Sequence, residues 1–280
     1  MGNFGRAAGS GSETLLATKG DTVRIIAVAN QKGGVGKTDL TVNISCQLAS
    51  VGQRVLLLDM DPQANATDYL VSPDTPIGMT AADLLLDDSV GLEDVMIENC
   101  RDKLDIIPSH ASLSSSQIKL ANDVNMQFKL KRKLKALVDS KRDYDFVFID
   151  TPPSLGLLTV NTLTAANEVI IPVQTQYFAM DGVVQLQDTI KRVREDINPN
   201  LKVLGVVLTM YDTRTLISRE VRAKVKDEFS GRVFSTVIPV NVRLAEAPSH
   251  HESIFEYDPK CKGARAYREL AKEILSCQAA

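Results

Sequence analysis

The sequence is poor in the residues from which covalent staples and metal centres are built. Its 280 residues include four cysteines and three histidines. No two cysteines form a CxxC pair, and none stands near a histidine at the spacing of a metal site. A chain of this length buries about three quarters of its unfolded surface, so its core needs no such support. The cysteines are therefore predicted to be reduced structural thiols.

Long apolar runs and a strong charge of one sign are also missing. No run approaches the roughly 20 residues of a membrane span, and no signal peptide is recognisable. The formal net charge is −3, so any contact with nucleic acid would depend on a local patch. Residues 1–22 are rich in Gly, Ser, Ala and Thr and are predicted to form a flexible tail. No repeat or linker divides residues 23–280, which are predicted to form one domain.

Short β-branched runs alternate with amphipathic stretches along this domain. Predicted strands are Val23–Ala29, Arg54–Leu58, Leu104–Ile107, Asp145–Ile149, Glu168–Val173, Lys202–Thr209 and Val233–Ile238. Predicted helices are Thr38–Val51, Ser112–Val138, Leu157–Ala166, Asp181–Arg194, Ser218–Phe229 and Ala264–Leu275. Strands separated by helices imply right-handed crossovers. The fold class is α/β, with a mostly parallel twisted sheet covered by helices on both faces.

A glycine-rich loop follows the first strand and leads into a helix. Its sequence, Asn-Gln-Lys-Gly-Gly-Val-Gly-Lys-Thr at residues 30–38, is a relaxed form of the phosphate-binding pattern GxxxxGK[ST]. Glycines let successive N–H groups point at one anion, and the helix start adds its positive dipole end. Lys37 can reach the β and γ phosphates of a nucleotide, and the Thr38 hydroxyl can ligate Mg²⁺. The predicted nucleotide-binding residues of the loop are Gly33, Gly34, Val35, Gly36, Lys37, Thr38 and Asp39.

The run KGGVGKT resembles the deviant Walker A motif of the ParA/MinD/Soj ATPases, a group of P-loop NTPases. The resemblance extends from about Arg24 to Leu275, and the segments 208–214 and 241–250 are similar to the chromosomal ParA/Soj branch. It implies ATP and Mg²⁺ as cofactors and a homodimer in the ATP state. It also implies that Lys32 acts across the dimer on the partner's phosphates, as an arginine finger does.

Two strand ends beside this loop bear carboxylates. Asp61 follows the second strand and is predicted to orient the attacking water, so the predicted catalytic residues are Lys32, Lys37 and Asp61. Asp150 ends the strand FVFI and is predicted to lie at the Mg²⁺ site beside Thr38. Residues 58–67 resemble the family's switch segment. Asp59 has a weaker claim on the metal and is predicted to brace either this segment or the metal's surroundings.

The adenine pocket and one position of the loop are less typical. By resemblance Met210, Pro239 and Asn241 flank the base, although packing at strand ends would account for them equally well. Asp39 stands where the family usually has a second threonine near the α phosphate. We expect its carboxylate to weaken nucleotide affinity unless it turns away from the phosphates.

Basic residues concentrate between residues 191 and 243, with eleven Lys and Arg against six Asp and Glu. A solvated helix with acidic partners would explain this cluster, but the family resemblance favours DNA binding without sequence preference. The predicted DNA-binding residues are Arg219, Arg222, Lys224 and Arg243. Val240 stands where many relatives have arginine. A second basic run, residues 129–135, is predicted to be the solvated face of a helix with a leucine stripe.

The predicted function is that of an ATP-hydrolysing DNA-partitioning protein, cytoplasmic and associated with the nucleoid. By resemblance its ATP dimer binds DNA until a ParB-type partner stimulates hydrolysis. The short, mixed-charge C-terminal helix argues against membrane recruitment of the MinD kind and favours docking on the domain. The scattered cysteines argue against an iron–sulfur reductase. A positioning ATPase for another cargo and a nucleotide-gated scaffold remain as alternatives.

Overall fold

The computed structural model describes residues 23–139, 143–176 and 179–277. Eight strands form one sheet in the order β3-β4-β2-β5-β1-β6-β7-β8, parallel except for β3. The strands are β1 (Arg24–Val28), β2 (Val55–Asp59), β3 (Ile97–Arg101), β4 (Leu104–Ile107), β5 (Phe146–Asp150), β6 (Glu168–Gln174), β7 (Lys202–Tyr211) and β8 (Val233–Pro239). The predicted α/β class is confirmed.

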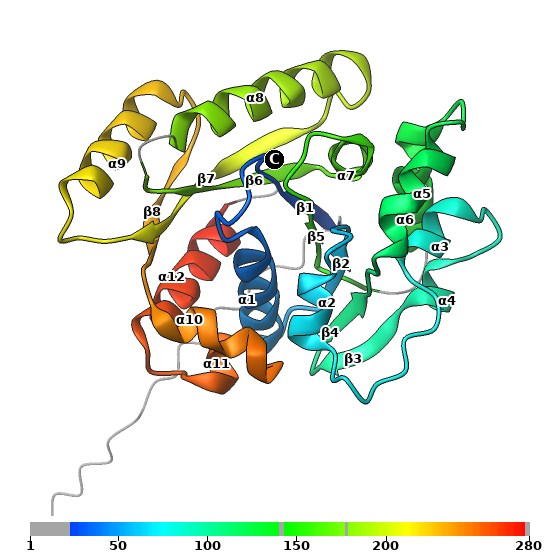
Figure 1. Cartoon of the computed structure of the whole chain (residues 1–280), viewed down its shortest axis with the longest axis horizontal. Coiled ribbons are helices and arrows are strands. Elements are labelled where there is room, and N and C mark those ends of the chain that lie inside the picture. Colours follow the sequence, from blue (N-terminus) through cyan, green and yellow to red (C-terminus); the bar gives the residue numbers. More distant parts are fainter. Residues whose placement is uncertain (1–22, 140–142, 177–178, 278–280) are drawn as a thin grey trace, which may run out of the picture.

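Helices cover both faces of this sheet, with α7 and α8 on one side and α1 and α12 on the other (Figure 1). The longer helices are α1 (Lys37–Ser50), α5 (Ser112–Leu120), α6 (Lys129–Asp139), α7 (Leu157–Ala165), α8 (Ala179–Asp196), α9 (Leu216–Glu228) and α12 (Lys262–Ser276). The short ones are α2 (Asn65–Leu70), α3 (Ala81–Leu86), α4 (Leu92–Val95), α10 (Val242–Glu246), α11 (Ile254–Tyr257), η1 (Met126–Phe128) and η2 (Ala247–His250).

Each face of the sheet has its own apolar core. Strands β1, β2 and β5 are buried throughout because helices cover them on both sides. One core lies under α5 to α9 and includes Leu134 and Val183. The other lies under α1, α2 and α12 and includes Leu40 and Leu270. Docking of α12 on the domain is confirmed, since Leu270 and Ile274 are fully buried.

The structure differs from the sequence predictions at one long helix, at strand β3 and at several short helices. The single helix expected over residues 112–138 is broken into α5, η1 and α6. Between them the backbone N–H of Asn125 donates to the carboxylate of Asp123, a local turn that competes with helix. The antiparallel strand β3 was not predicted, because its five residues are only partly buried and show no apolar run.

Strand β8 forms one edge of the sheet and has a wide bulge. The step from Val206 to Leu208 on β7 faces the longer stretch from Val233 to Val237 on β8. In the bulge, the N–H groups of Ser235 and Thr236 donate to the Glu273 carboxylate of α12, at 2.9 and 2.7 Å. Helix α12 therefore satisfies backbone donors that the neighbouring strand leaves unpaired.

Candidate nucleotide site

The loop between β1 and α1 is held by side-chain hydrogen bonds from neighbouring strands. Gly34 and Gly36 have φ values of 69° and 82°, a region that glycine reaches without steric cost. Thr209 of β7 donates to the Val35 carbonyl at 2.8 Å. The Asn30 amide donates to the Pro172 carbonyl of β6 and accepts from the N–H of Lys32. The fold therefore fixes the loop with its N–H groups at the start of α1.

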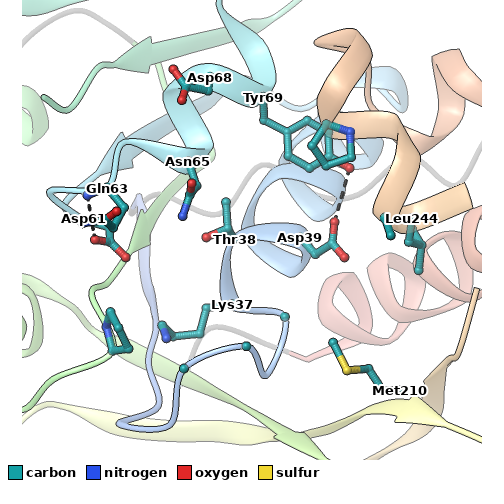
Figure 2. A pocket seen from close by; sticks show the side chains of 16 residues that line it. Lys37, Thr38, Asp39, Asp61, Gln63, Asn65, Asp68, Tyr69, Met210 and Leu244 are labelled. Atoms are coloured by element: carbon teal, nitrogen blue, oxygen red, sulfur yellow. Dashed lines mark hydrogen bonds between the residues drawn. The ribbon is translucent and has the colours of Figure 1, made fainter. Parts of the chain in front are cut away.

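A cavity of about 450 Å³ opens above this loop. It lies at the carboxyl ends of the central strands, where ligands bind in open parallel sheets. Figure 2 shows Lys37, Thr38 and Asp39 of α1 in the middle of the view, Asp61 and Gln63 to their left, and Tyr69 beside Asp39. The lining residues are Gly33, Gly34, Gly36, Lys37, Thr38, Asp39, Asp61, Gln63, Asn65, Asp68, Tyr69, Pro153, Met210, Leu244, Ala245 and Pro248.

Lys37 is the basic side chain that lines this cavity. It is buried, and desolvation lowers the pKa of its ammonium group, while Asp150 and Asp61 act in the opposite direction. These two carboxylates supply the nearby negative charge that a desolvated ammonium group needs. Lys32, by contrast, is partly exposed at the start of the loop. The two lysines thus differ in burial, as an intramolecular and an intersubunit role would require.

Thr38 and Asp150 lie in direct contact, as the sequence predicts. The Thr38 hydroxyl donates to one Asp150 oxygen at 2.7 Å, and Thr41 donates to the other at 3.2 Å. Burial raises the pKa of Asp150. A hydroxyl and a carboxylate oxygen are the ligands that Mg²⁺ prefers, so the residues present fit that ion. Within the described residues no cluster of three His, Cys, Asp or Glu could hold a metal, so a cation here would share its coordination with phosphate and water.

Asp59 braces the segment around Asp61. Its side chain is fully buried and accepts hydrogen bonds from the N–H of Asp61 at 3.1 Å and from the N–H and hydroxyl of Thr67, both at 2.8 Å. Burial raises the pKa of its carboxyl group. Both carboxylate oxygens of Asp59 are thus used to hold the segment from Asp61 to Thr67. Of the two roles predicted for Asp59, the structure therefore favours the brace over direct contact with a metal.

Asp61 is held at the cavity wall, and little of its side chain is exposed. One carboxylate oxygen accepts the N–H of Gln63 at 3.0 Å, and the backbone carbonyl accepts the Ser109 hydroxyl at 2.7 Å. Both bonds fix the loop before α2, as Figure 2 shows for Gln63. The carboxylate is therefore oriented in advance, with its second oxygen available to the cavity.

A second cavity, of about 390 Å³, continues from the first and shares Gly36 and Asp39 with it. The three residues predicted to flank the base, Met210, Pro239 and Asn241, all line it. Met210 has a φ of 49°, a strained conformation for a side chain with a Cβ atom, and strain of this kind concentrates at binding sites. This geometry suits a base at the end of a phosphate chain.

The predicted DNA-binding residues lie on α9 and at the start of α10, and each has a partner. The Arg222 guanidinium lies 5.8 Å from the centre of the Tyr211 ring, and Lys224 forms a 3.7 Å ion pair with Glu228. Arg243 pairs with Glu246 at 2.9 Å. Arg219 contacts the Thr215 carbonyl at 3.5 Å. The structure brings Arg222 and Arg243 to the same region, since Tyr211 and Arg243 line one surface hollow.

The second basic run agrees only in part with its prediction as a solvated face: Lys131, Arg132 and Lys135 are exposed. The leucine stripe is confirmed, with Leu130, Leu134 and Leu137 all buried. Lys129, however, is also buried and bridges Asp88 and Asp123, both at 2.9 Å. Lys133 donates to three backbone carbonyls of residues 87–90. Both lysines fasten a turn, and the buried Lys129 is not available to DNA, because a buried ammonium group needs its partners.

Several cavity residues received no role from the sequence. They come from the segment after Asp61 and from the segment around α10, which lies within the family-like residues 241–250. The residues are Gln63, Asn65, Asp68, Tyr69, Leu244, Ala245 and Pro248. Only their position next to a motif could have identified these residues, since most of their side chains do not indicate a chemical role by themselves. Thr41 could have been found from helical spacing, because it lies one turn after Thr38 on the same face.

Residues 23–203 match a family described as an AAA domain. The chain is 45% identical to the sporulation initiation inhibitor protein Soj of Bacillus subtilis, covering 90% of this chain and 98% of that protein. It is 43% identical to the chromosome partitioning protein ParA of Caulobacter vibrioides, covering 91% of this chain and 94% of that one. The chain belongs to the ParA/Soj family of ATPases. The predicted family and enzyme class are confirmed.

A solved structure supports the fold of this ParA/Soj protein. It is described as cobyrinic acid a,c-diamide synthase of Mycobacterium smegmatis with a bound ATP analogue and magnesium. The two chains are 37% identical, with a TM-score of 0.78 over 90% of this chain and 94% of that one. None of the helices in residues 23–139, 143–176 and 179–277 combines the length and apolar character that crossing a bilayer requires.

Proposed function

We propose that this ParA/Soj ATPase positions DNA through a cycle of ATP binding and hydrolysis. In this cycle two subunits close around ATP, the dimer holds DNA without sequence preference, and a ParB-type partner stimulates hydrolysis and releases it. The cofactors are ATP and Mg²⁺. The observation that supports the proposal best is that the phosphate loop, Thr38 and Asp61 line one cavity, with the buried Asp150 hydrogen-bonded to Thr38. Association with the nucleoid would follow from DNA binding.

Hydrolysis would depend on charge placement more than on covalent chemistry. Lys37, already desolvated beside two carboxylates, would stabilise the β and γ phosphates. Asp61 would orient the attacking water with the carboxylate oxygen that Gln63 does not use. Thr38 and Asp150 would hold Mg²⁺, which supplies positive charge against the phosphate oxygens. Lys32, at the exposed start of the loop, would reach the phosphates of the partner subunit, and turnover would therefore require a dimer.

DNA would be held by charged side chains of α9 and α10. Lys224 and Arg243 are exposed. Lys224 pairs with Glu228 of its own helix, and Arg243 pairs with Glu246 of its own helix and with Asp258. Such exposed pairs contribute about 0–1 kcal/mol, so a phosphate oxygen can replace the glutamate at little cost. Contacts of this kind neutralise backbone phosphates and recognise no base. Binding would therefore be independent of sequence and weakened by salt.

The proposal is tested by duplex DNA binding of the purified protein with ATP and Mg²⁺, with ADP, and without nucleotide. We expect salt-sensitive binding that needs ATP, that is lost in Lys32→Ala, and that weakens when Arg219 and Arg222 are both replaced by alanine. A matched control replaces Lys131 and Arg132, two exposed basic residues of α6, and should bind as the wild type does. ATP turnover without any DNA binding at low salt would contradict DNA as cargo and favour a protein or another assembly.

A nucleotide-gated scaffold is the second candidate, and the carboxylate of Asp39 in the nucleotide cavity favours it. A negative charge beside the phosphates would oppose tight binding and fast turnover. Phosphate release by the wild type and by Lys32→Ala separates the two functions. Turnover that disappears in Lys32→Ala supports the ATPase cycle. Equal residual release in both proteins would support the scaffold.

A further inference from the structure

The carboxylate of Asp39 occupies a place that a nucleotide must pass. Asp39 lies in the first turn of α1 and lines both cavities, so it stands between the phosphate loop and the base pocket. The first cavity is lined by one lysine and three aspartates, Lys37 against Asp39, Asp61 and Asp68. A phosphate chain brought close to the free Asp39 carboxylate would meet like-charge repulsion in a partly desolvated space.

Tyr69 of α2 holds this carboxylate. Its hydroxyl lies 3.3 Å from one Asp39 oxygen, and Figure 2 shows the tyrosine ring approaching Asp39 from the side opposite Met210. The tyrosine is almost completely buried, so water cannot take the place of Asp39 as a partner. The contact turns the charge toward α2.

The direction of this hydrogen bond is fixed by a chain of donors. The N–H of Ile254 donates to the Asn43 side-chain oxygen at 2.9 Å, which sets the orientation of the buried amide. The Asn43 nitrogen then donates to the Asp39 carbonyl at 2.8 Å and to the Tyr69 oxygen at 3.2 Å. The tyrosine therefore has only its own proton left to offer, and that proton goes to the Asp39 carboxylate.

We propose that Tyr69 is a positioning residue that holds the Asp39 carboxylate away from the phosphates and so sets the nucleotide affinity of this ATPase. The inference rests on the proposed nucleotide site. Tyr69 belongs to α2, and α2 begins directly beyond the Asp61 loop, where Asp59 binds Thr67. A displacement of α2 would withdraw the tyrosine, release the charge into the cavity and favour loss of the nucleotide. The position of α2 and nucleotide affinity are thus linked through one side chain.

The test is a double-mutant cycle on binding of a fluorescent ATP analogue with Mg²⁺. Tyr69→Phe should weaken binding about tenfold, the usual cost of one lost hydrogen bond to a charged group. Asp39→Asn alone should change affinity little, because the charge is already held away. Tyr69→Phe combined with Asp39→Asn should restore wild-type affinity, since no charge remains to be released. The matched control is Tyr144→Phe, which removes another buried tyrosine–aspartate hydrogen bond, to Asp105, outside the site.

Each outcome of this cycle supports or overturns the role of Tyr69. Equal weakening by Tyr69→Phe in the wild-type protein and in the Asp39→Asn variant would show a purely structural role and overturn the proposal, as would unchanged affinity in Tyr69→Phe. Asp39→Glu tests the same placement without altering the core: its longer side chain should no longer fit the tyrosine and should weaken binding. Undiminished binding by Asp39→Glu would also contradict the proposal. Lys37→Ala tests the nucleotide site separately from the role of Tyr69, because loss of binding in this variant supports the site whatever the result for Tyr69→Phe.

Discussion

The nucleotide site and the basic face hold their charged side chains in opposite ways. The basic face consists of Arg219, Arg222, Lys224 and Arg243. In the site, Asp59 and Asp150 are fully buried and each accepts hydrogen bonds from named donors. On the basic face, 58% of the Lys224 side chain and 52% of the Arg243 side chain are exposed. A buried group must be held in one geometry, whereas an exposed group can adapt to its ligand. The site therefore presents its charged groups in one arrangement, and the basic face presents side chains that can move.

The largest effect should come from the exposed lysine of the site. We expect Lys32→Ala to lower ATP turnover about 1,000-fold, as removal of a cation supplied in trans does in related chemistry. Affinity for ATP should stay within about threefold, because Lys37 remains. Phosphate release and nucleotide binding measure the two quantities, with Lys131→Ala as the control. Turnover within about tenfold of wild type would rule out the crossing role of Lys32.

Asp61→Asn should follow, with turnover reduced about 100-fold and ATP binding preserved. The amide keeps the shape of the side chain but cannot accept a proton or orient water as a carboxylate does. ATP-dependent DNA binding should persist and outlast that of the wild type, because hydrolysis ends it. Single-turnover hydrolysis and DNA release, measured together, check this. Fast release without hydrolysis would break the proposed link between the two regions.

Asp59→Asn should reduce the free energy of unfolding by about 2 kcal/mol, because it places an amide where three donors converge on buried oxygens. Urea unfolding of the protein without nucleotide measures this loss. Asp212→Asn is the control, since that aspartate pairs with the exposed Arg214. A stability unchanged in Asp59→Asn would mean that Thr67 and Asp61 keep their positions without the brace.

Replacing Arg219 and Arg222 together should weaken DNA binding about tenfold. The slope of the logarithm of the binding constant against the logarithm of the salt concentration should fall by about two, since two fewer phosphates are neutralised. Basal ATP turnover should remain, because neither side chain lines the nucleotide cavities. Binding at several salt concentrations gives the slope. An unchanged slope would exclude these residues from the DNA contact and leave Arg243 and Lys224 as the candidates.

Asp39→Thr should have the smallest effect, a gain in ATP affinity of at most about threefold, because Tyr69 already turns the carboxylate aside. Burial raises the pKa of Asp39 to about 7, while the bond from Tyr69 lowers it. Titration with ATP at one fixed pH measures the gain. A gain of about 100-fold would show that the carboxylate faces the phosphates in spite of Tyr69.

The sequence predicted most of the regular fold because the central strands are continuous apolar runs. Strands such as β5, residues FVFID, are buried throughout, and glycines after β1 mark the loop. Strand β3 and the break between α5 and α6 were missed, since tertiary pairing and a local turn decide them. The short helices α2 and α10 were also missed, because helices of five or six residues have too few turns to show a period.

In the candidate site, too, contacts set by neighbouring strands could be predicted, and contacts set by tertiary packing could not. Thr38 and Asp150 were predictable as a pair, because a loop and a strand end on neighbouring strands must meet. The hydrogen bond from Tyr69 to Asp39 was not, since it joins two helices 30 positions apart and depends on how α2 packs. The burial of Lys129 could not be predicted either, because nothing in the sequence distinguishes this lysine from the others of its run.

The carboxylate of Glu273 on the bulge of β8 has a consequence for assembly. An open sheet edge invites a strand from another molecule, and a carboxylate seated on its N–H groups, like the bulge itself, blocks that growth. At the opposite edge the short antiparallel β3 has an irregular register and offers a poor template. Neither edge of the sheet therefore favours fibre-like pairing between two copies of the chain. The proposed ATP-dependent dimer would then form away from both edges, and its assembly would depend on the nucleotide.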